Sequence, residues 1–338
     1  MRIGIVVRSH DASARVRALQ FVPAWQRAGA EVRVLAWDAP VDRVAVAGRT
    51  AEVVALGWWA DVVLLQKPVL PAVAVRVLAA VNRRLVVDLD DATWVSAADR
   101  TVSAARSARL VTTLEAATAV VAGSGHLAAL LAALHPGVDP VVLRPSVAVD
   151  PAVPAAGPSG GPLVAGWIGS PGNVGDLVPP VRAALAALVA AGTIEVRIVS
   201  SDRPDLGFPT TFVPWSVAAE RDAVAGLEVG LMPLADDPRS AGRCGYKAIQ
   251  SMAAGRPVVA SPVGCAPELV HPGRTGYLAS SPGEWRAALR LLAGDEALRA
   301  RLGAGGRALV AAEADASHTG RALLGLLFEV ARRPRWRG

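Results

Sequence analysis

Apolar residues occur along this chain in short runs, separated by longer segments in which apolar and polar positions alternate with the period of a helix. In the first half, the runs predict strands at 3–8, 32–37, 62–66, 85–89, 119–122 and 141–143. Strands that alternate with helical segments are typical of a parallel sheet covered by helices. Residues 1–150 are therefore predicted to form one doubly wound α/β domain of the Rossmann type.

The same alternation restarts after a segment rich in proline and glycine. Neither a helix nor a strand can persist over residues 151–162, so this segment is predicted to be a linker. Beyond it, apolar runs predict strands at 163–168, 194–200, 211–213, 229–232 and 258–260, and helical periodicity dominates from 284 to 330. We expect a second Rossmann-like domain over 163–315, then over 316–338 a helix that could cross back to the first domain and a basic tail. Two such domains would face a cleft at the carboxyl ends of their strands.

Length and composition agree with two domains, because 338 residues with a hydrophobic fraction of 52% suffice for two cores. No apolar run approaches the ~20 residues that a membrane helix requires, and the N-terminal run is too short for the core of a signal peptide. We therefore expect a soluble cytoplasmic protein. Cys244 and Cys265 are too few for a disulfide scaffold or a four-cysteine zinc site, and they are predicted to be small buried residues.

The chain has a net charge of +6, and its basic residues are almost all arginines, since Lys67 and Lys247 are the only lysines. The arginines are scattered, and no basic stripe interleaved with aromatic residues is present, so nucleic-acid binding is not expected. A denser basic group with one aromatic residue closes the chain: Arg332, Arg333, Arg335, Trp336 and Arg337. Two interpretations of this tail stay open, a peripheral contact with the inner face of a membrane and a solvated tail, and the second is favoured.

The most informative segment covers 243–264, where a short helix opened by glycine runs into an apolar strand. The start of a helix presents N–H groups and about half a positive charge, which suits an anion. We expect Gly245 to leave this approach unobstructed. Lys247 and Gln250 are three residues apart and share a helix face, and Arg243 precedes the first turn. These residues suit a nucleotide diphosphate, although on the motif alone a surface helix with solvated charges has about equal weight.

A second type of nucleotide site is not indicated. The sequence after the first predicted strand, R-S-H-D-A-S-A-R at 8–15, lacks the G-x-G-x-x-G pattern that cradles a dinucleotide pyrophosphate. A nicotinamide-dependent dehydrogenase is therefore not expected.

Residues 243–278 resemble the donor domain of family 4 retaining glycosyltransferases, which have the GT-B fold. The segments that carry this resemblance are M-A-A-G-R-P-V-V-A-S at 252–261, Gly264, E-L-V at 268–270 and G-R-T-G-Y-L at 273–278. Weaker similarity at 13–17, 88–91 and 166–170 extends it over most of the chain. The resemblance implies transfer of a sugar from a UDP- or GDP-sugar, without a metal or other cofactor, with retention at the anomeric carbon. The acceptor would be a glycan, a lipid-linked sugar or a small molecule.

The chain departs from this family at its acidic pair. The family usually has two Glu separated by seven residues, and Gly242 and Gln250 stand at those places. An amide can hold ribose hydroxyls because it both donates and accepts hydrogen bonds, whereas Gly242 cannot contact the sugar. In the loop after 168, where the family usually has Arg and Lys for the diphosphate, this chain offers Ser170, Gly172 and Asn173. We therefore expect other cations to supply the missing charge.

Those cations are predicted to be Arg243 and Lys247. Trp215, at the end of a predicted strand, could stack on or flank the base, with an ordinary core tryptophan of about equal weight. Glu268 could cap a turn or reach a nucleotide hydroxyl, and the structural role is favoured. The predicted donor-binding residues are Gly169, Ser170, Asn173, Trp215, Arg243, Cys244, Gly245, Lys247, Gln250 and Glu268.

In the first domain, acidic residues surround the end of the strand predicted at 85–89. By the resemblance, Asp90 stands where the family has a histidine near the reacting sugar. Asp90 and Asp91 are predicted to be catalytic residues that orient acceptor or donor hydroxyls. Asp88 is predicted to be a helix cap or loop acceptor.

Three residues near the N-terminus complete the predicted site on the acceptor side: Ser13, Arg15 and Arg17. The two arginines would face an acceptor phosphate or acidic sugar, and the interpretation as solvated helix charges has about equal weight.

Three classes of function stay open. A metal-independent glycosyltransferase is favoured. A nucleotide-sugar epimerase of the same plan is the second class, and a catalytically silent module that binds a nucleotide sugar is the third, because the acidic pair is absent.

Overall fold

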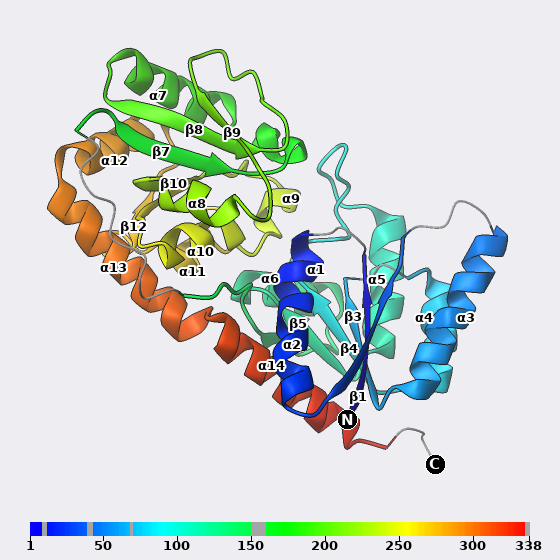
Figure 1. Cartoon of the computed structure of the whole chain (residues 1–338). Helices are drawn as coiled ribbons and strands as arrows, with labels where there is room; N and C mark the ends of the chain where they lie inside the picture. The colour runs from blue at the N-terminus through cyan, green and yellow to red at the C-terminus, as the bar shows by residue number, and fades with distance from the viewer. Residues whose placement is uncertain (9–11, 39–42, 68–69, 150–159, 335–338) are drawn as a thin grey trace. The chain divides into compact units, whose positions relative to one another are not determined.

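The computed structural model describes residues 1–338 apart from 9–11, 39–42, 68–69, 150–159 and 335–338. The chain forms two α/β units (Figure 1). Unit 1 comprises Met1–Ser146, Gly242–Cys244 and Ala316–Gly338, and unit 2 comprises Val147–Ala241 and Gly245–Asp315. Most of the predicted linker, 151–159, lies outside the described residues, as do Arg335, Trp336 and Arg337 of the basic tail.

Unit 1 has a parallel sheet of six strands in the order β2-β1-β3-β4-β5-β6. The strands are β1 (Arg2–Val7), β2 (Glu31–Ala36), β3 (Val62–Gln66), β4 (Leu85–Leu89), β5 (Ala119–Ala122) and β6 (Val141–Val142). Its helices are α1 (Ala12–Arg17), the 3-10 helix η1 (Leu19–Phe21), α2 (Val22–Arg27), α3 (Arg43–Trp59), α4 (Ala72–Val81), α5 (Ala104–Ala116), α6 (Gly125–Leu134) and α14 (Ala316–Ala331).

The two faces of this sheet are covered by different helices, because successive side chains of a strand point to opposite faces. Val63, Leu65 and Val87 pack with residues of α3, α4 and α5 in one core. Their neighbours Leu64 and Val86 belong to the other core, which contains residues of α1, α2 and α14. Strands buried on both faces explain why they read as continuous apolar runs.

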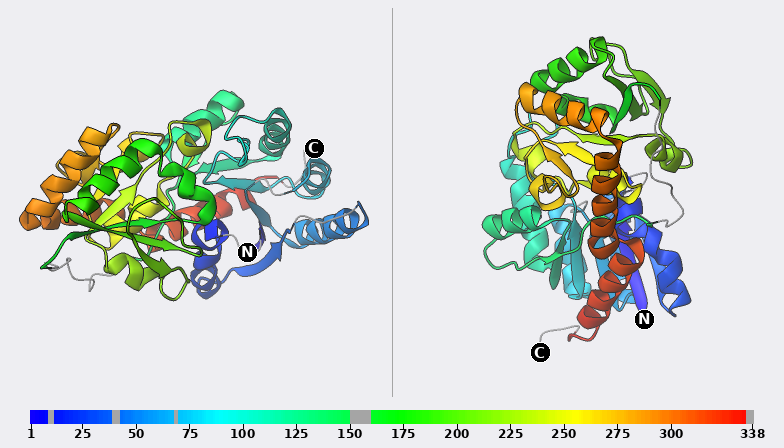
Figure 2. Two further views of the ribbon diagram at one scale, coloured as in Figure 1. Left: turned by 90° about the horizontal axis from the view of Figure 1, so that it is seen from above. Right: turned by 90° about the vertical axis from the view of Figure 1, so that its left-hand side faces the viewer.

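The last helix is part of unit 1. α14 contacts β3, β4 and η1, and Figure 2 shows it from two further directions. Its Gly320 lies against Phe21, where a Cβ atom would be 2.8 Å from the ring, and the indole N–H of Trp25 donates to the Gly320 carbonyl at 2.9 Å. The close approach requires glycine at this helix position.

Unit 2 has a second parallel sheet of six strands, in the order β12-β11-β10-β7-β8-β9. The strands are β7 (Leu163–Ile168), β8 (Ile194–Ser200), β9 (Thr211–Pro214), β10 (Val229–Met232), β11 (Val258–Ala260) and β12 (Gly276–Leu278). The helices are the 3-10 helix η2 (Pro171–Asp176), α7 (Pro179–Ala190), α8 (Glu220–Ala225), α9 (Pro238–Ala241), α10 (Tyr246–Ala253), α11 (Ala266–Leu269), α12 (Pro282–Gly294) and α13 (Glu296–Glu313).

The predicted fold class of two parallel-sheet α/β domains is confirmed. Eleven of the strands lie within one residue of their predicted ends, but the short strand β12 was not predicted. None of the helices in the described part of the chain is long and apolar enough to span a membrane.

Candidate functional site

In unit 2, the predicted donor residues follow the carboxyl ends of several strands. Gly169 and Ser170 come directly after β7, Trp215 directly after β9, and the loop after β10 leads through α9 toward α10. Because the strands are parallel, these ends lie along one edge of the sheet, which is where α/β folds bind ligands.

A chain of hydrogen bonds joins three of these residues through a fourth that the sequence analysis missed. Gln250 of α10 donates its amide to Glu220 Oε1 at 2.8 Å, and the indole Nε1 of Trp215 donates to the same oxygen at 3.3 Å. At the other end of the chain of bonds, Lys247 Nζ donates to Gln250 Oε1 at 3.4 Å. Glu220 and Gln250 are both buried. In the sequence, Glu220 looks like an ordinary acidic residue in the first turn of a helix, and nothing there indicates these partners.

Gly245 precedes α10 with a φ of 70°, in the left-handed region that favours glycine. A Cβ atom at this position would lie 2.4 Å from Leu269 and 3.0 Å from the sulfur of Cys265. The glycine is therefore required by backbone conformation and by packing against α11. The expectation that Gly245 also leaves the approach of an anion unobstructed stays a prediction.

The loop after β7 is tied to α9. Ser170 precedes η2, and Asn173 donates its backbone N–H to the Ser170 carbonyl at 2.9 Å. Asp176, buried at the end of η2, accepts a hydrogen bond from Ser240 Oγ of α9 at 3.2 Å. Asp237 accepts from the Ser240 backbone N–H at 2.9 Å. These bonds hold Ser170 and Asn173 on a defined loop.

Two other predicted donor residues, Gly169 and Glu268, lie in different surroundings. Gly169 packs under Trp167, where a Cβ atom would be 2.3 Å from the indole ring. Glu268 lies in the first turn of α11 and is half-buried.

The segment Gly242–Cys244 belongs to unit 1. A Cβ atom on Gly242 would be 2.1 Å from the Cβ of Ala92, so no glutamate fits at this place in the present backbone. Cys244 is buried in the core of unit 1, with its sulfur 3.8 Å from Ser124 Oγ. The prediction that both cysteines are buried is confirmed, and this burial gives Cys244 a packing role instead of a contact with the donor. Arg243, between them, is half-buried.

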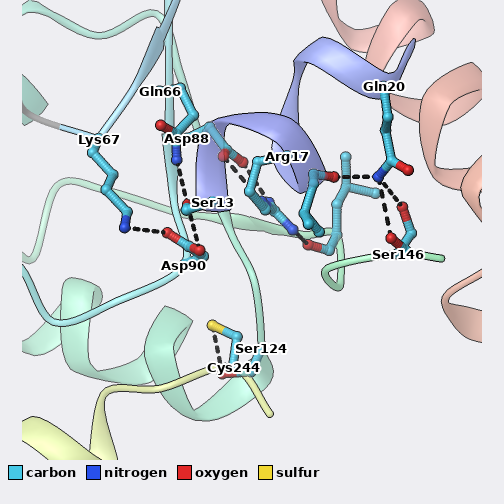
Figure 3. A network of polar contacts seen from close by, with 12 residues as sticks. Ser13, Arg17, Gln20, Gln66, Lys67, Asp88, Asp90, Ser124, Ser146 and Cys244 are labelled. Atoms are coloured by element: carbon cyan, nitrogen blue, oxygen red, sulfur yellow. Dashed lines mark hydrogen bonds and ion pairs between the residues drawn. The ribbon is translucent and has the colours of Figure 1, made fainter. Parts of the chain in front are cut away.

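In unit 1, a buried ion pair joins α1 to β4 (Figure 3). Arg17 donates from Nε to Asp88 Oδ2 at 3.0 Å and from Nη2 to Asp88 Oδ1, and its third nitrogen donates to the Leu143 carbonyl at 2.6 Å. Burial disfavours the charged guanidinium, but the charge and hydrogen bonds of Asp88 outweigh it and raise the pKa of Arg17. Both side chains are almost fully buried.

This pair corrects two expectations. Arg17 does not face an acceptor, because its side chain is 2% exposed and its donors are used within unit 1. Asp88 is a partner of Arg17 and not a helix cap. Arg15, the other arginine of α1, is half-buried.

A second polar cluster lies beside this pair (Figure 3). Gln66, at the end of β3, donates to Ser13 Oγ at 2.7 Å, and Ser13 Oγ donates to Asp90 Oδ2 at 2.5 Å. Two-residue periodicity explains the geometry: Val86 faces α1 and α14, so Asp88 and Asp90 continue on the same side. The structure thus brings together Ser13 and Asp90 as predicted site residues and adds Gln66.

Lys67 is the third residue, after Glu220 and Gln66, that the sequence analysis did not place in the site. Its Nζ lies 3.1 Å from Asp91 Oδ2 and 3.4 Å from Asp90 Oδ1. Its backbone has a φ of 63°, which is costly for a residue with a side chain. The available signals were its rarity, as one of two lysines, and a polar pair that ends an apolar strand. Asp91 keeps 48% of its side-chain exposure, while Asp90 keeps 15%.

These carboxylates do not form a metal cluster. Within the described ranges, no group of three or more His, Cys, Asp or Glu side chains is placed to hold a metal ion.

Comparison with known proteins agrees with this architecture. Residues 176–295, about a third of the chain, match the family model "Glycosyl transferases group 1". The chain has the GT-B fold. A search of curated protein sequences found no match.

Several solved structures resemble the chain over nearly its whole length. The sucrose-phosphate synthase of Thermosynechococcus elongatus is 16% identical, with a TM-score of 0.76, and the match covers 98% of this chain and 99% of that one. HepE of Anabaena, solved with UDP and glucose, is 17% identical with a TM-score of 0.69, over 97% and 100% of the two chains. A glycosyltransferase of Rickettsia africae is 12% identical with a TM-score of 0.69, over 98% and 99%.

Proposed function

We propose that this chain is a glycosyltransferase that takes a sugar from a nucleotide diphosphate. The observation that carries the proposal is the polar chain Trp215–Glu220–Gln250–Lys247 beside the start of α10, within the segment that matches the glycosyltransferase family. The UDP and UDP-glucose complexes of HepE support UDP as the first donor to test.

The start of α10 is proposed to bind the diphosphate. The helix has no side-chain cap at Gly245, and its dipole favours an anion at this end. Lys247, in the first turn, adds a full positive charge. Gln250, one turn later, is proposed to bind the ribose hydroxyls, and Ser170 and Asn173 are proposed to add contacts from the loop after β7.

Asp90 and Asp91 of unit 1 are proposed to orient hydroxyls of the acceptor or the sugar. Asp91 keeps nearly half its side-chain exposure, so it can meet a substrate. Desolvation raises the pKa of Asp91 above its usual value, and the charge of Lys67 opposes this shift. Ser13 holds Asp90 in place. Arg15 remains a proposed contact for an acidic acceptor.

The proposed reaction retains configuration and needs no metal. The acceptor hydroxyl attacks the anomeric carbon as the bond to the diphosphate breaks, and its proton passes to the leaving phosphate oxygen. Preorganised N–H groups and a lysine stabilise the negative charge that develops on that oxygen. The acceptor is a glycan, a lipid-linked sugar or a small molecule.

Thermal unfolding with a panel of nucleotide diphosphates tests the proposal. A ligand that binds only the native state raises the Tm. UDP or GDP should raise the Tm in a concentration-dependent way, whereas uridine and guanosine at the same concentrations should have much smaller effects. A protein whose Tm responds to none of these nucleotides would contradict the proposal.

One observation favours a second candidate, a module that binds the nucleotide sugar without transferring it. Gly242 packs against Ala92, so the carboxylate that the family usually has at this place cannot be accommodated. Turnover distinguishes the candidates: the enzyme releases UDP from UDP-glucose in the presence of an acceptor, and the silent module binds UDP but releases none from any donor.

A further inference from the structure

We infer that Glu220 is a positioning residue that fixes the orientation of the Gln250 amide for nucleotide binding. This inference rests on the proposed function, since it concerns how one residue of the donor site is held. It is carried by the directions of the hydrogen bonds in unit 2.

Groups that can only donate stand at both ends of the chain of bonds. An indole N–H donates and cannot accept, so Glu220 Oε1 acts as an acceptor toward Trp215 at 3.3 Å. The Gln250 atom that lies 2.8 Å from the same oxygen must then be the amide nitrogen. An ammonium group also only donates, so the Gln250 atom 3.4 Å from Lys247 Nζ must be the amide oxygen.

These two constraints agree, and together they exclude the flipped amide. An amide with its oxygen and nitrogen exchanged would place two acceptors together at Glu220 and two donors together at Lys247. Gln250 therefore presents its carbonyl oxygen on the side of Lys247, at the start of α10.

Burial makes this arrangement costly to break. Glu220 is 7% exposed and Gln250 is 7% exposed, so neither can exchange its partner for bulk water. Glu220 is the acidic group of this chain of bonds. It contacts the Gln250 amide, and in the proposed site Gln250, not Glu220, contacts the nucleotide. The bond from Gln250 to Glu220 polarises that amide and makes its oxygen a better acceptor for a ribose hydroxyl.

Substitution of Glu220 by glutamine tests the inference. In Glu220→Gln, the new side chain can both donate and accept, so the Gln250 amide loses its single orientation. We expect UDP to bind about 2- to 10-fold more weakly, as measured by calorimetry. GDP is titrated in parallel, and the nucleotide that binds the wild-type protein is used for all variants.

Glu228 offers a matched control. It is also a buried glutamate of unit 2, but it directly precedes β10, at the opposite end of the strand from the loop that leads to the start of α10, and it accepts hydrogen bonds from the Val164 N–H and from Arg299. Glu228→Gln should leave the nucleotide affinity unchanged, although it also perturbs a buried carboxylate. This control separates orientation of Gln250 from a general loss of stability.

An exchange of the two residue types gives the sharpest test. Gln250→Glu alone places two carboxylates within hydrogen-bond distance and should weaken binding more than Glu220→Gln. In the double variant Glu220→Gln/Gln250→Glu, an amide again donates to a carboxylate, and affinity should recover toward the wild-type value.

The outcomes distinguish this inference from the proposed function. If the wild-type protein binds neither UDP nor GDP, the proposed function and the inference both fail. If it binds one of them, while Glu220→Gln matches the wild type and the double variant is no better than Gln250→Glu, only the inference is overturned.

Discussion

Polar groups at the carboxyl ends of the two sheets are organised in different ways. In unit 1, each charge described near β4 faces an opposite charge: Arg17 pairs with Asp88, and Lys67 lies between Asp90 and Asp91. In unit 2, the polar chain contains one carboxylate, Glu220, and it passes through an amide to a single lysine. Unit 1 thus holds fixed ion pairs, and unit 2 holds a directed series of donors and acceptors that ends at a helix start.

Residues that serve the fold differ from residues that can serve a ligand in how fully their polar groups are already paired. A buried bidentate pair such as Arg17–Asp88 satisfies its own groups and has no capacity left for a substrate. Lys247, half-buried in the first turn of α10, places a positive charge at a helix start, and both the charge and the helix dipole favour an anion.

The largest expected effect comes from breaking the buried pair. Arg17→Met leaves Asp88 buried without its cation, so we expect the free energy of unfolding to fall by about 3–5 kcal/mol, measured by urea denaturation. The double variant Arg17→Met/Asp88→Leu should recover much of this loss. If Arg17→Met were as stable as the wild type but lost sugar transfer, Arg17 would be an acceptor contact after all.

A smaller effect is expected at the start of α10. Gly245→Ala combines a left-handed backbone with a collision at Leu269, whereas Gly255→Ala has a similar φ of 71° and no atom within 4 Å of the new Cβ. Gly255→Ala is the control and should lower the free energy of unfolding by about 1–2 kcal/mol. Gly245→Ala should lower it by about 1–3 kcal/mol more. Equal losses in the two variants would show that packing against α11 does not require this glycine.

Lys67 allows charge and backbone strain to be separated in unit 1. Lys67→Ala and Lys67→Gly both remove the cation beside Asp90 and Asp91, so both should lower kcat/KM by about 10- to 100-fold. The free energy of unfolding of Lys67→Gly should be about 1 kcal/mol higher than that of Lys67→Ala, because glycine tolerates the φ of 63°. Normal turnover in Lys67→Gly would remove Lys67 from the site.

The alternating pattern of the chain was sufficient to predict the fold. Buried parallel strands are continuous apolar runs, so β3, β4, β5, β7, β8, β10 and β11 were predicted with the ends that the structure has. The strand β12 was missed because its sequence, G-Y-L, opens with glycine after a turn and is not a continuous apolar run like the V-V-A of β11, which has the same length. Its Gly276 is required by close approach to β11, where a Cβ would be 1.9 Å from the Val258 carbonyl oxygen, and such contacts are not visible in sequence.

The candidate site was only partly predictable. Residues near a glycine-opened helix carry a local signal, and Lys247 and Gln250 were found in this way. The burial of Arg17 depends on Asp88, which is 71 positions away, and the role of Glu220 depends on a partner 30 positions away. Long-range pairing of this kind leaves no local pattern, so Arg17 was misassigned and Glu220 was missed.

The start of α10 is proposed to bind a nucleotide diphosphate with the help of Lys247. Calorimetric titration of the wild-type protein and of Lys247→Ala with UDP and GDP measures this binding. We expect one nucleotide to bind the wild type and to bind Lys247→Ala about 10-fold more weakly, since a charged hydrogen bond is lost. Equal affinity in the two proteins, or no binding to the wild type, would contradict the claim.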